Sequence, residues 1–376
     1  MKIPFNKPYM TGSELDYVRQ AHENGTLAGD GPFTRRCHQW LESNSGARRA
    51  LLSHSCTAAL EMSALLLNIE PGDEFIIPSY TFVSTANAFV LRGGVPVFVD
   101  IHADTLNLDE SLINAAISSK TKAIVPVHYA GVGCEMDKVV AIAKSRGIAI
   151  VEDAAQGVMA KYKGRPLGSI GDFGTYSFHE TKNVISGEGG ALLVNNPSMV
   201  ERAEVIREKG TDRSRFFRGQ VDKYTWQEVG SSFLPGELIA AFLWAQLQHA
   251  REITDIRLAA WNRYHELFKN MEIAGTIRRP IVPLDCVHNA HMYYLLLPED
   301  TDRSEVLQSM ERDGVNAVFH YVPLHSSPAG KRLGKIGSDL SVTEDISQRL
   351  IRLPMWVGIS EEEQMVVYNS VCRALS

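Results

Sequence analysis

Short apolar runs alternate with segments of helical periodicity from residue 50 to residue 194, and this pattern constrains the fold more than any other feature of the sequence. Each run is apolar at successive positions, which is typical of parallel strands covered on both faces. The helical segments between the runs supply the crossovers that parallel strands require. The sequence therefore predicts an α/β fold with a mostly parallel sheet of the seven-stranded type. The expected strands are residues 50–52, 74–78, 96–100, 123–127, 148–151, 173–178 and 191–194.

A long helix over about residues 235–268 is expected to separate this region from the rest of the chain. Pro235 fits the first turn of a helix, and apolar residues recur after it; whether the helix is continuous, kinked or interrupted stays open. We expect it to link a large domain, residues 1–270, to a smaller C-terminal α+β domain, residues 271–376. The other elements expected after the sheet are helix 197–209, a charged and aromatic loop over 210–224, strands 292–297 and 317–321, helix 303–312 and two C-terminal helices.

Composition argues against several classes of protein. The net charge of −6 and the pI near 6.1 disfavour a nucleic-acid or anionic-membrane surface. The five cysteines are scattered without a C-x-x-C pair, and the H-x-x-H pair of His288 and His291 has no third ligand nearby. We therefore expect neither a disulfide framework nor a metal site. No apolar run approaches the roughly 18 residues of a spanning helix, and the first residues lack a signal-peptide pattern, so we expect a cytoplasmic protein.

Familiar nucleotide-binding motifs are missing from the sequence. It has no G-x-x-x-x-G-K-[ST] motif and no G-x-G-x-x-G after an expected strand. This counts against nucleoside triphosphate sites and against a nicotinamide-dependent oxidoreductase. Neither a helix-turn-helix nor a basic N-terminal extension is visible, which counts against a DNA-binding regulator.

Lys182 is the first candidate for chemistry. It lies in a polar loop between the apolar runs 173–178 and 191–194, and the glycine-rich turn Gly187–Gly190 follows it. A lysine at such a place suits a Schiff base, which needs a desolvated amine of lowered pKa. The alternative is an ordinary lysine that faces solvent. Ser177, at the end of the preceding run, could hydrogen-bond a phosphate.

Residues that follow other expected strands are further candidates. Asp153 could meet a cationic ring nitrogen, as a pyridoxal phosphate enzyme requires, or could merely cap a helix. The turn that leads into Thr57 and Ala58 offers backbone N–H groups and a helix N-terminus to a phosphate, with plain N-capping as the alternative. Phe82 could present its ring face to a planar cofactor, or it could belong to the core.

Two segments are candidates for binding substrate. Arg213, Arg218 and Lys223 alternate with aromatic residues, which suits an anionic ligand with a stackable ring, such as a sugar nucleotide. A solvated surface loop or a subunit interface are the alternatives there. Tyr321 and His325, around the end of an expected strand, could bind a substrate hydroxyl or carboxylate.

Four of these features occur in a characteristic order: a strand-to-helix phosphate turn, an aspartate at a strand end, a loop lysine and a glycine-rich turn. In this order the sequence resembles the fold-type I pyridoxal phosphate enzymes, and more closely the DegT-type sugar aminotransferases. The likeness extends over essentially the whole chain. The segments that carry it are Ile77–Phe82, Val151–Gln156, Ser177–Lys182 and Gly187–Gly190.

The resemblance implies a pyridoxal 5'-phosphate cofactor and a role for each matching residue. Lys182 would form the Schiff base with the cofactor and then move the proton. A branch of the family that carries histidine in place of this lysine performs dehydration, so Lys182 argues against that branch. The other roles implied are Asp153 at the pyridinium nitrogen, Gln156 near the ring hydroxyl, Phe82 stacked on the ring, and Thr57, Ala58 and Ser177 at the phosphate.

The resemblance also implies a reaction and an assembly. The reaction is transfer of an amino group from L-glutamate to the 4-keto carbon of dTDP-4-keto-6-deoxy-D-glucose, giving dTDP-4-amino-4,6-dideoxy-D-galactose and 2-oxoglutarate. A different nucleotide-linked keto sugar, or a non-catalytic pyridoxal phosphate-binding regulator, stays open.

The assembly that the resemblance implies is a homodimer with shared active sites. Many relatives carry Gly-x-Asn-x-Arg in the loop that reaches the partner's cofactor phosphate; here the loop reads Gly230-Ser-Ser232-Phe-Leu234, and whether Ser232 replaces the asparagine stays open.

Overall fold

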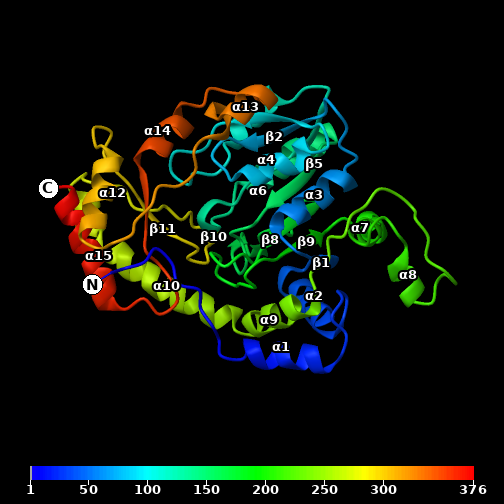
Figure 1. Ribbon diagram of the computed structural model, residues 1–376. Coiled ribbons are helices and arrows are strands. Elements are labelled where there is room, and N and C mark those ends of the chain that lie inside the picture. The colour runs from blue at the N-terminus through cyan, green and yellow to red at the C-terminus, as the bar shows by residue number, and fades with distance from the viewer. Residues whose placement is uncertain (1) are drawn as a thin grey trace.

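One eight-stranded sheet forms the centre of the molecule (Figure 1). The computed structural model describes residues 2–376. The seven strands expected from the sequence all form, which confirms the α/β fold with a mainly parallel sheet. Their spatial order is β1 (Arg49–Ser53), β9 (Gly190–Val194), β8 (Phe173–Ser177), β5 (Ala149–Asp153), β4 (Thr121–Ile124), β2 (Glu74–Pro78), β3 (Val95–Val99) and then the short additional strand β12 (Lys335–Ile336).

The direction of the strands decides where functional residues gather. β9 runs antiparallel to both of its neighbours, β1 and β8, and the other neighbouring strands in the sheet are parallel. The carboxyl ends of β1, β2, β5 and β8 therefore lie at one edge of the sheet, together with the start of β9. In open α/β sheets this edge is where ligands bind.

Helices cover both faces of the sheet because the side chains of each strand point alternately to opposite faces. On β2, Ile76 packs into one buried cluster, whereas Phe75 and Ile77 pack into the other. The first cluster is covered by α1 (Glu14–Glu23), α2 (Pro32–Ser45), α6 (Met136–Arg146) and α9 (Glu237–Gln248). The second is covered by α3 (Cys56–Leu66), α4 (Val83–Val90) and α7 (Val200–Arg207).

The long helix expected over about 235–268 consists of two helices. α9 ends at Gln248 and α10 (Ala250–Leu267) begins two residues later, because His249 leaves helical geometry with φ −102° and ψ 7°. Of the three possibilities left open by the sequence, an interruption is the one that occurs. Figure 1 shows the pair running along the base of the sheet toward the C-terminal elements. Among residues 2–376, no helix has both the length and the apolar character needed to cross a membrane.

The C-terminal part has a core of its own and also touches the large sheet. β11 (Tyr293–Leu296) pairs with β13 (Leu350–Leu353), and these strands pack with α10, α12 (Arg303–Arg312) and α15 (Glu361–Ala374). β12 joins the edge of the large sheet beside β3. The other elements are α5 (Ile113–Ala116), α11 (Lys269–Ile273), α13 (Pro328–Leu333), α14 (Ser341–Arg349), β6 (Lys161–Tyr162), β7 (Arg165–Pro166) and β10 (Cys286–Val287).

Three local expectations differ from the structure. Residues 317–321 form no strand, because only Val318 makes a bridge, to Arg352. Three helices rather than two follow that segment. The loop expected over 210–224 contains the short helix α8 (Arg213–Phe217), which projects from the body of the molecule beside α7 in Figure 1.

Candidate active site

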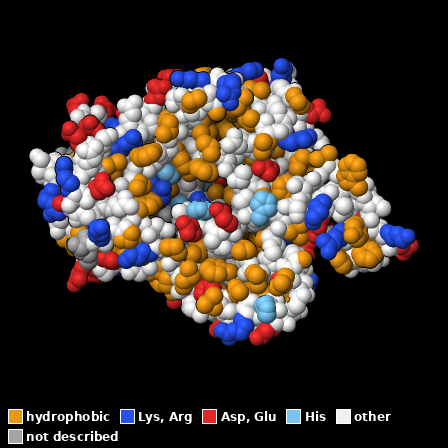
Figure 2. Space-filling view, in the orientation of Figure 1, with side chains coloured by type: hydrophobic (Ala, Val, Ile, Leu, Met, Phe, Trp, Pro, Cys, Tyr) orange, Lys and Arg blue, Asp and Glu red, His pale blue; other side chains and the backbone are white. Residues whose placement is uncertain are grey.

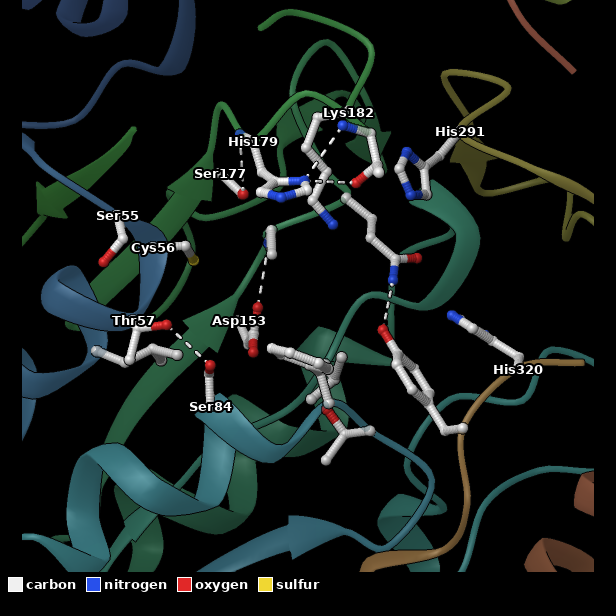
Figure 3. A pocket seen from close by; sticks show the side chains of 18 of the residues that line it. Ser55, Cys56, Thr57, Ser84, Asp153, Ser177, His179, Lys182, His291 and His320 are labelled. Carbon is white, nitrogen blue, oxygen red and sulfur yellow. Dashed lines mark hydrogen bonds between the residues drawn. The ribbon is translucent and has the colours of Figure 1, made fainter. Parts of the chain in front are cut away.

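A cavity of about 580 Å³ opens at the carboxyl edge of the sheet. In Figure 2 it appears as a hollow near the middle of the face shown, with histidine and acidic side chains at its rim. Figure 3 shows Ser55, Cys56 and Thr57 on one side of it, His291 and His320 on the other, and Asp153 between them. The cavity thus brings together residues from strand ends that are far apart in the sequence.

Asp153 is the last residue of β5 and is almost completely buried. Its Oδ2 accepts a hydrogen bond of 2.7 Å from the Thr85 hydroxyl, and its Oδ1 accepts one of 3.1 Å from the backbone N–H of Ala155. Thr85 is in turn held by the Thr81 hydroxyl at 2.9 Å. These contacts fix the carboxylate at the cavity, where it suits a cationic partner.

Lys182 lies in the loop between β8 and β9, and a tight backbone network holds that loop. Its N–H donates to the carbonyl of His179 at 2.9 Å, and the N–H of Glu180 donates to the carbonyl of Gly187 at 2.9 Å. Within residues 2–376 the amine of Lys182 has no hydrogen-bond acceptor. Burial lowers the pKa of this amine, and the nearby Arg352 guanidinium lowers it further, while Cys56 and Asp153 act in the opposite direction. A lysine of lowered pKa is better suited to act as a base or nucleophile.

The start of α3 forms the opposite end of the cavity. Ser55 is the N-cap, and its Oγ accepts a hydrogen bond of 3.0 Å from the N–H of Ala58. The Thr57 hydroxyl donates to Ser84, at the start of α4, at 2.8 Å. A helix N-terminus lined with hydroxyl groups is well suited to a phosphate.

Gly190 allows the first residue of β9 to pass directly against this helix start. A Cβ atom added there would lie 2.4 Å from the backbone nitrogen of Cys56 and 2.4 Å from the carbonyl carbon of Ser55. No other residue fits without moving the start of α3. The glycine-rich turn therefore lets the backbone approach the proposed phosphate seat.

Aromatic and amide side chains line another side of the cavity. Gln156 is fixed at both ends: its Oε1 accepts from Ala130 N–H at 2.7 Å, and its Nε2 donates to the Tyr321 hydroxyl at 3.0 Å. The ring of His320 stacks on that of Tyr321 with centroids 3.7 Å apart. Phe82 is 56% exposed at the cavity mouth, so its ring face is accessible to a ligand.

Comparison with known proteins gives the family. Residues 8–372 match the profile of the DegT/DnrJ/EryC1/StrS aminotransferase family. The chain belongs to this family. It is 32% identical to the spore coat polysaccharide biosynthesis protein SpsC of Bacillus subtilis, over 98% of this chain and 96% of that protein. It is 30% identical to GDP-perosamine synthase of Caulobacter vibrioides, over 96% and 95% of the two chains.

Solved structures of similar proteins support the same family. The putative sugar aminotransferase Spr1654 of Streptococcus pneumoniae, in a form with pyridoxamine phosphate, superposes with a TM-score of 0.91 at 27% identity, covering 100% of this chain and 98% of that one. The same protein has been solved in its pyridoxal phosphate form, with a TM-score of 0.90. Pyridoxal phosphate, the cofactor expected from the sequence, is thus confirmed as that of the family.

The residues of this family member fit that cofactor. The unpartnered amine of Lys182, the buried carboxylate of Asp153 and the α3 N-terminus offer, in one cavity, groups suited to an aldehyde carbon, a ring nitrogen and a phosphate. Gln156, Ser177, Phe82 and Tyr321 line the same cavity.

Other predicted residues lie outside the cavity of their own chain. Ala58 is buried behind the α3 start, and His325 links Ser79 at 2.7 Å to Glu344 at 3.2 Å. Ser232 forms a bridge with Glu208, away from the cavity.

The basic residues proposed for substrate lie on and beside α8. Arg213 pairs with Glu208 at 3.6 Å and Arg218 with Glu204 at 2.7 Å, while Lys223 is exposed. Two of the three positive charges are therefore already matched by carboxylates of the same chain. None of the three lines the cavity of its own chain.

Sequence reasoning missed several residues of the site, and Thr85 and Arg352 illustrate why. Thr85 gives no signal of its own, because a threonine inside a short helix is common. Arg352 does give one, since it is a single arginine within the apolar strand Leu350–Leu353. A charge at such a position is rarely buried without a function or a partner.

Proposed function

We propose that this aminotransferase moves an amino group from L-glutamate to the 4-keto carbon of dTDP-4-keto-6-deoxy-D-glucose, giving dTDP-4-amino-4,6-dideoxy-D-galactose and 2-oxoglutarate. The observation that carries the proposal is the meeting of Lys182, Asp153 and the α3 N-terminus in one cavity of a DegT-family chain.

Different residues of the cavity would have different roles in the reaction. When bound, pyridoxal phosphate supplies an electron sink that stabilises negative charge on the carbon attached to the transferred nitrogen. Asp153 would hold the ring nitrogen and would favour its protonated, electron-withdrawing state. Lys182, whose amine has a lowered pKa, would move a proton from the donor carbon to the cofactor in the first half-reaction. In the second half-reaction it would move a proton from the cofactor to the sugar carbon. Gln156 and Tyr321 hold each other in place in the wall of the cavity.

Several observations support a nucleotide-linked keto sugar as acceptor. The names of two relatives place them in sugar chemistry, one as GDP-perosamine synthase and the other in spore coat polysaccharide biosynthesis. The cavity mouth carries the aromatic faces of Phe82 and Phe319, suited to apolar sugar or base surfaces. For the dTDP sugar, the support is sequence likeness to dTDP-4-amino-4,6-dideoxygalactose transaminase of the enterobacterial common antigen pathway, in residues 29–37, 217–226 and 319–325.

We also propose a homodimer in which each site is completed by the partner. Residues 213–226, here called the aromatic arm, project from the body and expose Phe217 at 68%, Tyr224 at 51% and Trp226 at 78%. Figure 2 shows apolar side chains over this arm. An exposed aromatic cluster of this kind is typical of an interface. In a dimer the arm would carry Lys223 and the loop of Ser232 toward the partner's cavity.

The test is a direct assay with product identification. The purified holoenzyme is incubated with L-glutamate and dTDP-4-keto-6-deoxy-D-glucose, and in parallel with the GDP- and UDP-linked 4-keto-6-deoxy sugars. We expect the 4-amino galacto sugar by NMR, formation of 2-oxoglutarate, and ping-pong kinetics. Amination of only the GDP or UDP sugar would overturn the dTDP assignment. Absence of amino transfer to any of them would overturn the proposed function.

A further inference from the structure

Asn183 directly follows Lys182, yet its side chain does not line the main cavity. It is almost completely buried and lies at a small hollow that adjoins the cavity at Lys182. Its Nδ2 donates to the carbonyl of Asn289 at 2.7 Å, and its Oδ1 lies 3.1 Å from Nδ1 of His291. Both ends of this amide are therefore bound to the segment 289–291, which is distant along the chain.

These two contacts fix where the hydrogens lie. A backbone carbonyl only accepts hydrogen bonds, so the Asn183 atom that faces Asn289 is the amide nitrogen, and the amide oxygen faces His291. Burial, together with the charge of Lys182, holds the pKa of the His291 imidazole well below its usual value, so the ring is neutral and has a single N–H. That N–H lies at Nδ1, where the oxygen of Asn183 accepts it, and Nε2 keeps its lone pair.

The segment 289–291 is a firm anchor for Asn183. The Arg257 guanidinium donates to the carbonyls of Ala290 and His291 at 3.0 and 2.7 Å. Ala290 has φ +50°, a conformation that a residue other than glycine keeps only where its surroundings hold it. The backbone to which Asn183 is bound is thus itself fixed in place.

The same anchor reaches the segment that follows Asp153. The side-chain amide of Asn289 donates to the carbonyls of Gln156 and Val158, both at 2.8 Å. Gln156 comes shortly after Asp153 in the sequence. The anchor therefore connects the loop that carries Lys182 to the segment that carries Asp153.

The lysine loop, residues 178–189, has no other hydrogen bond to a distant segment within residues 2–376. Its remaining hydrogen bonds join residues of the loop to one another, or to Ser177 directly before it. Val184 and Ile185 are buried, but apolar packing is not directional. Asn183 is thus the residue whose directional contacts set the position of the loop against the rest of the site.

We propose that Asn183 is a positioning residue, which holds the Lys182 amine at a fixed place relative to Asp153 through its bonds to Asn289 and His291. This inference rests on the proposed function, because it takes Lys182 as the residue that moves the proton in that reaction. A base must lie within hydrogen-bond reach of the proton that it takes, and a misplacement of about 1 Å can cost about 100-fold in rate. Asn183 therefore acts on the rate of proton transfer and not on substrate binding.

The first test follows the half-reaction of the holoenzyme with L-glutamate by the absorbance of the bound cofactor in a stopped-flow instrument. Asn183→Leu removes both hydrogen bonds at a similar side-chain volume. We expect the saturating rate to fall about 10- to 100-fold, while the half-saturating L-glutamate concentration stays close to wild type.

Asn195→Leu is the matched control for this substitution. The Asn195 amide also makes two hydrogen bonds, to the carbonyls of Gly168 and Gly171, both at 2.9 Å. It follows the end of β9, whereas the lysine loop precedes the start of that strand, so it lies at the opposite edge of the sheet. Asn195→Leu should therefore keep the wild-type rate.

The second test compares two substitutions of His291. The amide nitrogen of an asparagine can lie close to the place of imidazole Nδ1, so His291→Asn keeps the donor to Asn183, whereas His291→Leu removes it. We expect a rate near wild type for His291→Asn and a slower reaction for His291→Leu. Asn183→Leu combined with His291→Leu should be no slower than Asn183→Leu alone, because both changes remove the same contact. Equal losses in the two His291 variants would assign the chemistry to Nε2 and overturn the inference.

A third readout needs neither donor nor sugar. The absorbance of the bound cofactor as a function of pH gives the pKa of the nitrogen that Lys182 contributes. Displacing this nitrogen from Asp153 changes the charges around it, so we expect a shifted pKa in Asn183→Leu and an unshifted one in Asn195→Leu.

Each outcome decides the question. A wild-type rate in Asn183→Leu, an equal loss in Asn195→Leu, or a change confined to the half-saturating concentration overturns the inference. If Asn183→Leu fails to fold, equal rates in His291→Asn and His291→Leu overturn it. If the wild type does not react with L-glutamate, the proposed donor is wrong, and an unshifted pKa in Asn183→Leu overturns the inference. A wild type that completes the half-reaction but aminates no sugar contradicts the proposed function alone.

Discussion

At the scale of single residues, the proposed chemistry depends on Lys182. Its amine points into a cavity with no acceptor among residues 2–376, and burial lowers its pKa. We expect Lys182→Ala to reduce transamination by about 10³-fold or more, because proton transfer by a positioned group contributes about 10²- to 10⁴-fold. The variant should still fold and retain the cofactor, which separates loss of chemistry from loss of structure. Lys120→Ala, at an exposed lysine, is the control, and an active Lys182→Ala enzyme would contradict the assigned role.

The lowered pKa of Lys182 also predicts how stability varies with pH. Below the pKa that Lys182 has in the folded state, its amine is charged in both the folded and the unfolded protein. The full free-energy cost of burying that charge then lowers the free energy of unfolding. Between that pKa and the ordinary value of 10.5 the unfolded state binds more protons, so the cost declines as pH rises. Lys182→Met should therefore stabilise the apoprotein at about pH 6, by about 1.4 kcal/mol for each unit of pKa depression, and much less at about pH 10.

Thermal unfolding of the apoprotein at both pH values checks this. Lys120→Met, at an exposed position, corrects for the apolar gain of methionine. A stability gain at Lys182 that does not shrink as pH rises would be inconsistent with a buried amine.

Variants of Asp153 and Thr85 distinguish two proposed roles. Asp153 would contact the cofactor, whereas Thr85 holds Asp153 in position. Asp153→Asn removes the charge proposed to lie at the cofactor's ring nitrogen, and a hydrogen bond to a charged group is worth about 1.5–3 kcal/mol, or about 10- to 150-fold in kcat. Thr85→Val removes one donor at 2.7 Å and should cost about 2- to 10-fold. Steady-state kinetics on the two variants check the order, and a larger loss for Thr85→Val would reverse our assignment.

At the scale of elements, the contact between β9 and α3 depends on one glycine. Gly190→Ala would place a Cβ 2.4 Å from the Cys56 nitrogen and displace the start of α3. Overpacking of this kind costs about 1–3 kcal/mol, so we expect cofactor affinity to fall about 5- to 150-fold. Gly187→Ala is the matched control: Gly187 has φ +80° and open space around it, so alanine there strains the turn alone. Equal effects in the two variants, measured by cofactor titration, would contradict a role for close packing.

The sequence predicts the sheet well because its strands are signalled locally. A strand buried on both faces is mostly apolar, so β3 and β9 can be recognised from composition alone. The ends of such strands then locate the residues that follow them. Residues 317–321 look similar in sequence but make a single bridge, because pairing depends on a distant partner rather than on the segment itself. The α8 helix is held by ion pairs to α7, such as Arg218 with Glu204, which spacing along the chain does not reveal.

The distinction between local sequence signals and contacts to distant segments also applies to the site. Asp153 and Ser177 could be placed at the cavity because each ends an apolar strand. Arg352 could not, since it reaches the cavity from the C-terminal part, about 170 residues after Lys182 along the chain. Contacts between distant segments are set by tertiary packing, which local periodicity does not encode.

At the scale of the whole molecule, the cavity lies where the two parts of the chain meet. Lys182 and Asp153 come from the large sheet, whereas Tyr321 and Arg352 come from the C-terminal part. β12 and the hydrogen bond between the side chains of His325 and Ser79 hold that part against the sheet. Any change in their relative position would therefore alter the distance between Arg352 and the amine of Lys182.

The exposed aromatic arm leads to a prediction about how two copies of the chain form a dimer. Residues 213–226 are held on α7 by ion pairs, yet leave Phe217 and Trp226 mostly exposed. Burying such rings in a second copy would supply apolar area that the monomer leaves in water. We expect a dimer by light scattering, and the double variant Phe217→Asp with Trp226→Ser to shift it toward monomer with a matching loss of activity. Leu284→Asp, at a fully exposed leucine elsewhere, is the control and should leave the dimer intact. A fully active monomeric variant would show that each cavity is complete within one chain, and would remove the arm from the proposed site.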